Sequence, residues 1–182
     1  MQHDPITGYS EKLQIEKRYV TVTTKETLLE MVEAIEEASR ISLDTETTSL
    51  NPRKGKIIGF SITTKIGTGF YLPTLKWNNY TQKLEELLIE GKSTHNIAVR
   101  VMKMLKGKKL ICHNASFDLR YIKNYYGVSL IEDLWVDTAL LVHTVQEEGA
   151  GMGVFGWKPL AVSIQEHIGL SVEEAANKEQ VE

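Results

Sequence analysis

Three short apolar segments in the first half of the chain are separated only by turn-rich pieces. They are Ile41–Asp44, Lys56–Thr64 and Gly69–Leu72, and each favours a β-strand through its branched or aromatic residues. Asn51-Pro52 and Gly67 are typical of the turns between them. Strands joined in this way pair antiparallel, so this part of the chain predicts a three-stranded meander.

Helical periodicity surrounds the meander. A strand at Tyr19–Thr23 leads into a capping-box pattern, Thr23 followed three residues later by Glu26, and then an amphipathic helix over residues 25–38. Later apolar spacings predict helices around Leu84–Leu88, around Ile97–Leu105, over 115–126, over 136–145 and from Pro159 to about Gly169, with a strand at Lys108–His113. This order predicts an α/β fold in which helices flank a mixed β-sheet.

Composition excludes several classes of protein. The net charge of −3 argues against a protein that simply coats duplex DNA, which would be basic. The single cysteine, Cys112, cannot build a disulfide framework or a cysteine-based zinc site, and its apolar neighbours predict a buried strand position. No segment has the length of a signal peptide core or a membrane span, so we expect a cytoplasmic location.

Two carboxylates stand two residues apart on the strand that begins at Ile41. The period of a strand places Asp44 and Glu46 on the same face, where they repel each other and lose hydration. A divalent cation such as Mg²⁺ or Mn²⁺ is the usual reason for this arrangement, since these ions prefer oxygen ligands. The alternative is that the strand ends near residue 44 and both acids lie in a solvated loop.

A second polar motif opens the helix after the strand at Lys108–His113. Asn114 is expected to cap this helix, and Asp118 lies one turn inside, on the same side as the cap. Taken alone, Asp118 also fits a surface residue that interacts favourably with the helix N-terminus.

Together, Asp44-x-Glu46 and Asn114-x-x-x-Asp118 resemble the first two motifs of the DEDD (DnaQ-like) superfamily of 3′–5′ exonucleases. The likeness is greatest to the proofreading domain of family A, polymerase I type, DNA polymerases of bacteria and phages. Two later segments add to it: Asp137-Thr138-Ala139-Leu140 resembles the Asp-Thr helix of the family, and Trp157-Lys158-Pro159-Leu160-Ala161 resembles a segment downstream of that helix. The resemblance covers roughly residues 19–170.

This resemblance implies an RNase H-like fold and a metal-dependent hydrolase. Asp44, Glu46 and Asp118 would be catalytic and would bind two divalent ions, Mg²⁺ or Mn²⁺. The substrate would be the 3′ end of single-stranded DNA, and a DNA polymerase domain would be the partner, in the same chain or as a separate subunit. The residues implied to contact the substrate are Thr47, Leu50, Asn114 and Phe117. Asp137 would support the site without binding metal.

The third motif of the family, Tyr-x-x-x-Asp or His-x-x-x-x-Asp, is missing. No aspartate follows Asp137, and the helix that carries this motif would fall beyond Glu182. We therefore expect an N-terminal arm at residues 1–18 and an exonuclease domain at 19–182 that is truncated before its third motif. Two alternatives stay open: an RNase D-like RNA 3′-exonuclease, and a catalytically incomplete module that binds nucleic acid or docks on a polymerase.

Overall fold

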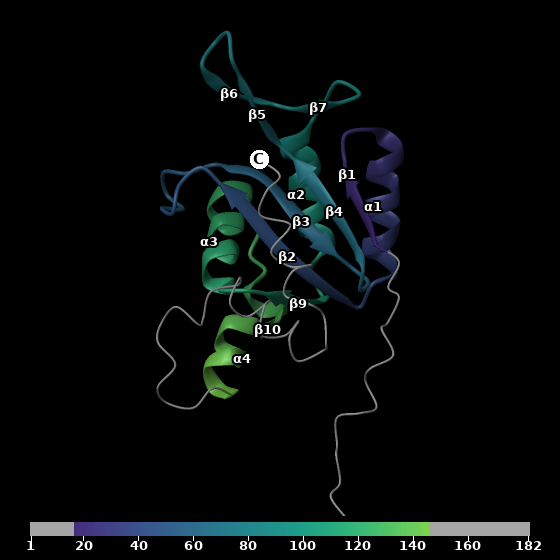
Figure 1. Cartoon of the computed structure of the whole chain (residues 1–182), viewed down its shortest axis with the longest axis vertical. Helices are drawn as coiled ribbons and strands as arrows, with labels where there is room; N and C mark the ends of the chain where they lie inside the picture. Colours follow the sequence, from purple (N-terminus) through teal and green to yellow (C-terminus); the bar gives the residue numbers. More distant parts are fainter. Residues whose placement is uncertain (1–16, 146–182) are drawn as a thin grey trace, which may run out of the picture. The chain divides into compact units, whose positions relative to one another are not determined.

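The computed structural model describes residues 17–145 of the chain (Figure 1). The described residues 17–138 belong to one compact unit, and the described residues 139–145 belong to a second. The strands are β1 Arg18–Thr21, β2 Arg40–Thr47, β3 Ile57–Thr63, β4 Thr68–Pro73, β5 Leu75–Asn78, β6 Lys83–Glu86, β7 Leu88–Ile89, β8 Lys92–Ser93, β9 Lys109–Cys112 and β10 Leu134–Asp137. The helices are α1 Lys25–Glu37, α2 Thr94–Met104, α3 Ala115–Tyr126, the short 3-10 helix η2 Ile131–Asp133, and α4 Thr138–Val145.

Six strands form one mixed sheet in the order β1-β4-β3-β2-β9-β10. β2, β3 and β4 pair antiparallel, which confirms the predicted meander. β1 joins β4 in parallel, and β9 and β10 extend the other side of β2 in parallel. The predicted α/β class with a mixed sheet is therefore correct.

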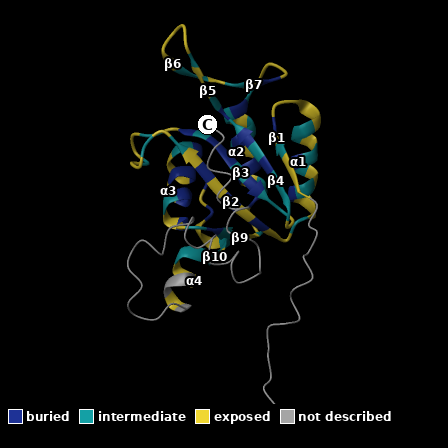
Figure 2. Ribbon diagram, in the orientation of Figure 1, coloured by how far each residue is buried: buried dark blue, intermediate teal, exposed yellow. Residues whose placement is uncertain are grey.

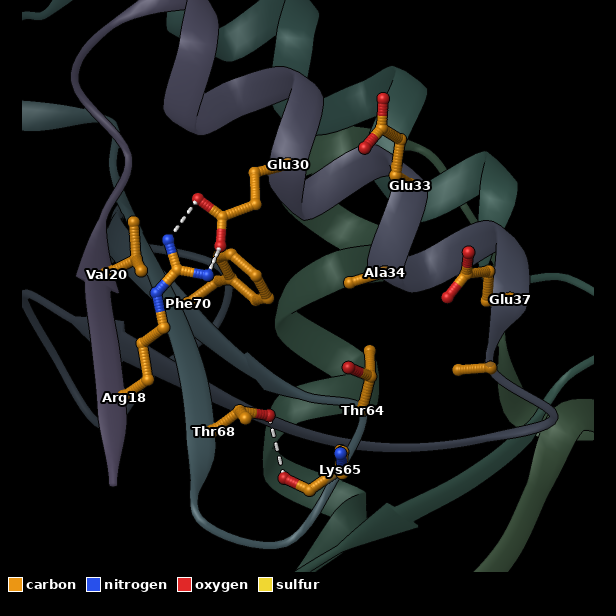
Figure 3. Close-up of a pocket in the computed structure, with 11 residues that line it drawn as sticks. Arg18, Val20, Glu30, Glu33, Ala34, Glu37, Thr64, Lys65, Thr68 and Phe70 are labelled. Atoms are coloured by element: carbon orange, nitrogen blue, oxygen red, sulfur yellow. Dashed lines mark hydrogen bonds and ion pairs between the residues drawn. The ribbon is translucent and has the colours of Figure 1, made fainter. Parts of the chain in front are cut away.

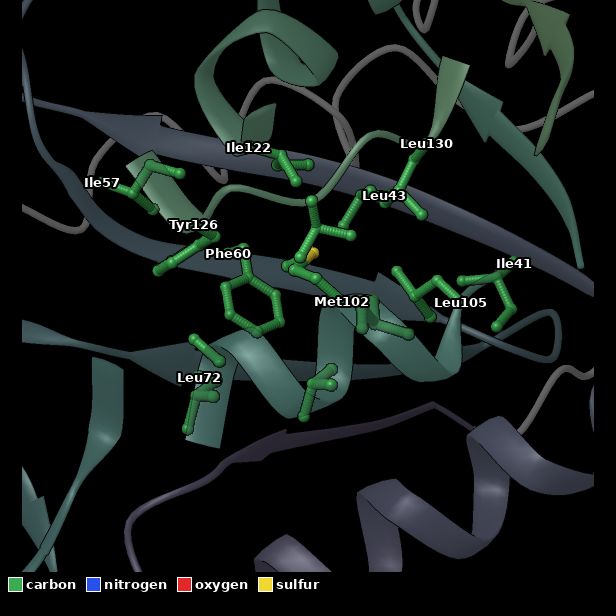
Figure 4. Close-up of a cluster of buried hydrophobic side chains, with 14 of the residues drawn as sticks. Ile41, Leu43, Ile57, Phe60, Leu72, Met102, Leu105, Ile122, Tyr126 and Leu130 are labelled. Atoms are coloured by element: carbon green, nitrogen blue, oxygen red, sulfur yellow. The ribbon is translucent and has the colours of Figure 1, made fainter. Parts of the chain in front are cut away.

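The core lies on one face of this sheet. Alternate residues of β2 are buried, namely Ile41, Leu43 and Thr45, while the residues between them are exposed (Figure 2). Leu43 packs in one cluster with Phe60 and Leu72 of the sheet, with Met102 of α2 and with buried residues of α3 (Figure 4). Because α1, α2 and α3 all contribute to this cluster, the other face of β2 is left for polar residues.

One expected element is of a different type in the structure. The segment around Leu84–Leu88 is not a helix: β6 pairs with β5, and β7 pairs with β8, as two small hairpins. Both hairpins use residues with positive φ, Gln82 at 53° and the Glu90-Gly91 pair at 49° and 74°, where a helix cannot continue. Helical spacing of three leucines was therefore misleading there.

The other differences concern boundaries. The cap of α1 is Thr24, not Thr23, and its partner in the capping box is Thr27 instead of Glu26. The helix expected from residue 136 begins at Thr138, because Val136 pairs in β10. Residues 1–16 of the expected arm and the helix expected from Pro159 lie outside the described residues. Within the described part of the chain, no helix is long and apolar enough to cross a membrane.

Candidate active site

The exposed face of β2 carries the first acid pair. β2 continues to Thr47, and both Asp44 and Glu46 point away from the core, as the period of two predicts. This excludes the loop alternative. Burial raises the pKa of Asp44, partly offset by the nearby His113. Burial and the neighbouring Asp44 carboxylate also raise the pKa of Glu46. Because the pKa of both carboxyl groups is raised, a cation bound between them would stabilise their charged forms.

Tyr71 of β4, the strand on the far side of β3 from β2, lies beside Glu46. Glu46 pairs with Gly59 of β3, and a Cβ atom on Gly59 would lie 2.6 Å from Cζ of Tyr71. The Tyr71 ring therefore covers Gly59 on the acidic face. Burial, followed by the Glu46 charge, raises the pKa of Tyr71. The sequence analysis missed Tyr71, because the alternation in β4 is visible in the sequence but its pairing with β3 is not.

Asp118 of α3 meets β2 from the core side. It is 2% exposed, and its Oδ1 accepts hydrogen bonds from the Thr45 backbone N–H at 2.9 Å and from the Thr45 hydroxyl at 2.5 Å. Burial raises the pKa of Asp118 to about 6, although both bonds from Thr45 act against that rise. The residue between the two acids of the first motif is thus the direct link to the second motif.

Asp137 caps the helix that carries Asp118. Its two carboxylate oxygens accept hydrogen bonds from the backbone N–H groups of Asn114 at 2.9 Å and Ala115 at 2.8 Å. Asn114 does occupy the N-cap position, but its conformation is left-handed with φ of 60° and its side chain makes no capping bond. The expectation that the Asn114 side chain caps α3 was wrong; a carboxylate from β10 satisfies the helix terminus instead.

The loop after β2 presents Leu50, one of the residues expected to contact the substrate. Leu50 is 87% exposed, so it does not belong to the core. The Thr47 hydroxyl donates to the Ser49 carbonyl at 3.1 Å, and the buried Tyr121 hydroxyl donates to the carbonyls of Ser49 and Asn51. Phe117 is half-buried and its ring lies 5.1 Å from that of Tyr121. The loop that displays Leu50 is therefore fastened to α3.

The donor chemistry of this region fits a hard divalent cation. Asp44 and Glu46 offer carboxylate oxygens on one face, and neither is neutralised by a salt bridge to a residue in the described range. Among residues 17–145, however, no three His, Cys, Asp or Glu side chains gather into a metal-holding group. Asp118 is linked to the pair through Thr45, whose N–H and hydroxyl hold its Oδ1, and the Asp44 charge is near enough to raise the pKa of Asp118 further.

A separate pocket of about 470 Å³ lies between α1 and the β1–β4 edge of the sheet. Arg18 crosses it to form an ion pair with Glu30, with one N–O distance of 2.9 Å (Figure 3). Glu33 and Glu37 line the same pocket. None of the acids of the two motifs lines it, so it is not part of the candidate active site.

Comparisons with known proteins agree with these motifs. Residues 19–153 match the model of a 3′–5′ exonuclease family of the DNA polymerase A type. DNA polymerase I of Borreliella burgdorferi is 33% identical over 110 residues, which are 59% of this chain and 11% of the polymerase. The chain thus spans about a tenth of that curated relative.

Solved structures share the fold. RNase D of Escherichia coli, described as an exoribonuclease involved in structured RNA processing, superposes with a TM-score of 0.56 and 18% identity over 85% of this chain and 34% of its own. The EXO domain of Nibbler from Aedes aegypti gives a TM-score of 0.51 and 11% identity over 74% and 63%. The six-stranded mixed sheet is the RNase H-like fold of these neighbours. With the family model matching most of its length, the chain belongs to the 3′–5′ exonuclease family, as a domain of the DnaQ-like type.

Proposed function

We propose that this chain is the proofreading exonuclease domain of a DNA polymerase. It would remove nucleotides from the 3′ end of single-stranded DNA and release nucleoside 5′-monophosphates. The observation that carries this proposal is the acid pair Asp44 and Glu46 on the exposed face of β2, joined through Thr45 to Asp118. The similarity to a DNA polymerase I favours DNA as substrate and a polymerase as partner.

The three acids share one role in this proposal. Asp44, Glu46 and Asp118 would hold Mg²⁺ or Mn²⁺, which would supply an activated water and positive charge for the oxygens of the phosphoryl group. The exposed Leu50 would lie against the terminal base, with Thr47, Asn114 and Phe117 around the terminal nucleotide. A helix cap from Asp137 keeps the start of α3 in place without touching the substrate.

Hydrolysis of a 5′-labelled single-stranded DNA oligonucleotide in the presence of Mn²⁺ tests the proposal. We expect a ladder that shortens from the 3′ end, and its loss in Asp44→Ala/Glu46→Ala. Asp118→Asn is the sharpest variant, because the asparagine oxygen can still accept both bonds from Thr45, so the fold is kept while the carboxylate is removed. Glu33→Ala/Glu37→Ala, which removes two exposed acids of α1, is the matched control and should leave the ladder unchanged.

The likeness in fold to an exoribonuclease gives a second candidate, trimming of RNA 3′ ends. The same assay with an RNA oligonucleotide of equal length separates the two. Faster degradation of RNA than of DNA would replace the proofreading proposal by the RNase D-like one. Binding of either strand without any cleavage would instead favour a module that only binds nucleic acid.

A further inference from the structure

A basic cleft lies next to the candidate active site, between the loop that follows Leu50 and the outer face of α3. Its volume is about 610 Å³. The residues that line it are Asn51, Pro52, Arg53, Arg120, Lys123 and Asn124. Three of these six side chains carry a positive charge and none is acidic. The chain as a whole has a net charge of −3, so this cleft is a local concentration of positive charge on an acidic protein.

The three cations are available to a ligand. Arg53, Arg120 and Lys123 are all exposed, and none of them forms an ion pair with a carboxylate in residues 17–145. Arg120, Lys123 and Asn124 follow one another at helical spacing, so they share one side of α3. The cleft therefore offers guanidinium and ammonium donors on one wall and a guanidinium on the other.

Both walls of the cleft are fixed. The Tyr121 hydroxyl of α3 donates to the carbonyls of Ser49 and Asn51, which ties the loop to the helix. Within the loop, the Asn51 side chain accepts from the Arg53 N–H at 2.9 Å, and the Asn51 carbonyl accepts from Lys54 and Gly55. The backbone of the cleft therefore needs little reordering on binding, and only the exposed side chains have to be ordered.

The position of the cleft suggests its ligand. Its loop wall directly follows Leu50, and its helix wall begins two residues after Asp118, with Lys123 about 9 Å further along α3 than Phe117 by the helical rise. A single strand whose 3′ end lies at Leu50 and Asp118 has its next phosphates nearby. Cationic side chains suit contacts with the phosphates of the backbone, which are independent of sequence.

We propose that Arg53, Arg120 and Lys123 bind the phosphodiester backbone of single-stranded DNA upstream of its 3′ end. This inference rests on the proposed function for the position of the 3′ end. The cleft holds the strand while the acids act on its terminus. It therefore contributes to affinity for long strands and leaves the chemistry at the last phosphodiester unchanged.

Binding measured apart from hydrolysis tests the cleft. Fluorescence anisotropy of a labelled oligothymidylate in EDTA would compare the full chain with Arg53→Gln/Arg120→Gln/Lys123→Gln. For a single strand each lost phosphate contact lowers the salt slope by about 0.7, so three contacts lower it by about 2. Between about 50 and about 200 mM salt, the wild type should then lose about 20-fold more affinity than the triple variant loses.

Two matched variants control for charge and folding. Lys25→Gln/Lys92→Gln/Arg100→Gln removes three exposed cations from a groove between α1 and α2, so equal changes in both triple variants would reduce the effect to net charge and overturn the proposal. Arg53→Lys/Arg120→Lys/Lys123→Arg keeps the charges and should keep the salt slope. An unchanged slope in the glutamine variant, or no binding by the wild type at low salt, also overturns it.

Hydrolysis of the same oligonucleotide with Mn²⁺ separates this inference from the proposed function. A raised KM with an unchanged kcat in the glutamine variant, and no effect on a dinucleotide, is expected. Binding that depends on the cleft, without any hydrolysis, would support the proposal for the cleft and contradict the proposed exonuclease activity. Hydrolysis that is unaffected by the cleft variant, at every strand length, would keep the exonuclease and reject the cleft.

Discussion

Gly55 shows how a single missing side chain supports the candidate site. A Cβ atom there would collide with the hydroxyl of Tyr121 and lie 3.0 Å from both Cζ of that ring and Cβ of Ser49. Tyr121 needs this space because its hydroxyl holds the carbonyls of Ser49 and Asn51. The absence of a side chain at Gly55 is thus coupled to the exposure of Leu50, five residues earlier.

Gly55→Ala should therefore destabilise the protein by about 1–3 kcal/mol and reduce exonuclease activity, because the loop has to move away from Tyr121. Denaturant unfolding measures the first effect. In combination with Tyr121→Phe, which removes the hydroxyl, the cost should be clearly less than the sum of the single costs. Additive costs would show that the two residues do not interact.

Cys112 belongs to the core, and its thiol should be unreactive toward alkylating reagents in the native protein. It is 2% exposed, and burial, with smaller contributions from Asp118, Asp137 and Asp44, raises its pKa to about 12. Since only the thiolate reacts, iodoacetamide should modify the native protein no faster than the protein unfolds. Mass spectrometry of samples quenched at intervals at about pH 8, with and without denaturant, checks this; rapid native labelling would contradict it.

The same shift predicts how stability changes at high pH. The unfolded chain releases the Cys112 proton near its ordinary pKa of about 9, before the folded chain does at about 12. The folded state is therefore favoured less and less as the pH rises through this window. Cys112→Ala should remove this particular contribution, so its stability should fall less steeply than that of the wild type between about pH 9 and pH 11.

At the scale of secondary structure, the start of α3 depends on a strand that is distant in sequence. Asp137 at the end of β10 accepts from two N–H groups of the first turn, and Asn114 adopts a left-handed conformation to allow this. β9 and β10 pair in parallel, with Asp137 opposite Cys112, so this register places the carboxylate at the helix terminus. The helix that carries Asp118 is therefore positioned by the sheet.

Asp137→Ala should destabilise the protein by about 1–2 kcal/mol through the lost cap. Asn114→Gly is the informative comparison, since glycine adopts a φ of 60° without strain and the asparagine side chain makes no capping bond. We expect the glycine variant to be as stable as the wild type in denaturant unfolding. If it loses as much stability as Asp137→Ala, the asparagine side chain is the true cap.

Much of the architecture was predictable because it follows from local periodicity. The alternation in β2 placed Asp44 and Glu46 on one face, and the limits of α3 followed from its apolar spacing and from Gly127. The hairpins at β5–β8 were not predictable, since Gln82 and Glu90 adopt positive φ without a local signal. β10 was missed because three of its four residues share the apolar character of the helix that follows.

The site was predictable only in part, because local patterns in the sequence do not show which distant residues meet. Its acids form recognisable motifs, but the contacts between motifs join residues far apart in the chain. Thr45 and Asp118 are 73 residues apart, and Tyr71 meets Glu46 only through the register of β3 and β4. Arg53 and Arg120 likewise meet at one cleft only after folding. No spacing in the sequence encodes these pairs.

At the scale of the whole molecule, metal binding should appear as stability. An ion that binds only the folded chain raises its free energy of unfolding, by about 2.7 kcal/mol at a 100-fold excess over Kd. Mn²⁺ should therefore raise the thermal midpoint of the wild type, and EDTA should reverse this. Asp44→Ala/Glu46→Ala should not respond, and in EDTA it should be at least as stable as the wild type, because two neighbouring, partly buried acids are gone. An equal rise in both proteins would place the ion elsewhere.

The contact between Thr45 and Asp118 has a consequence for how this chain can evolve. The middle residue of an acid-x-acid motif is ordinarily regarded as a free position, yet here its hydroxyl and N–H hold the third acid. Only serine or threonine retains both donors, so a change to valine, similar in shape, would keep the N–H but remove the hydroxyl bond to Asp118 while both neighbouring acids stay in place. Sequence variants of this domain should then tolerate change at position 45 far less than is expected of an unconstrained position.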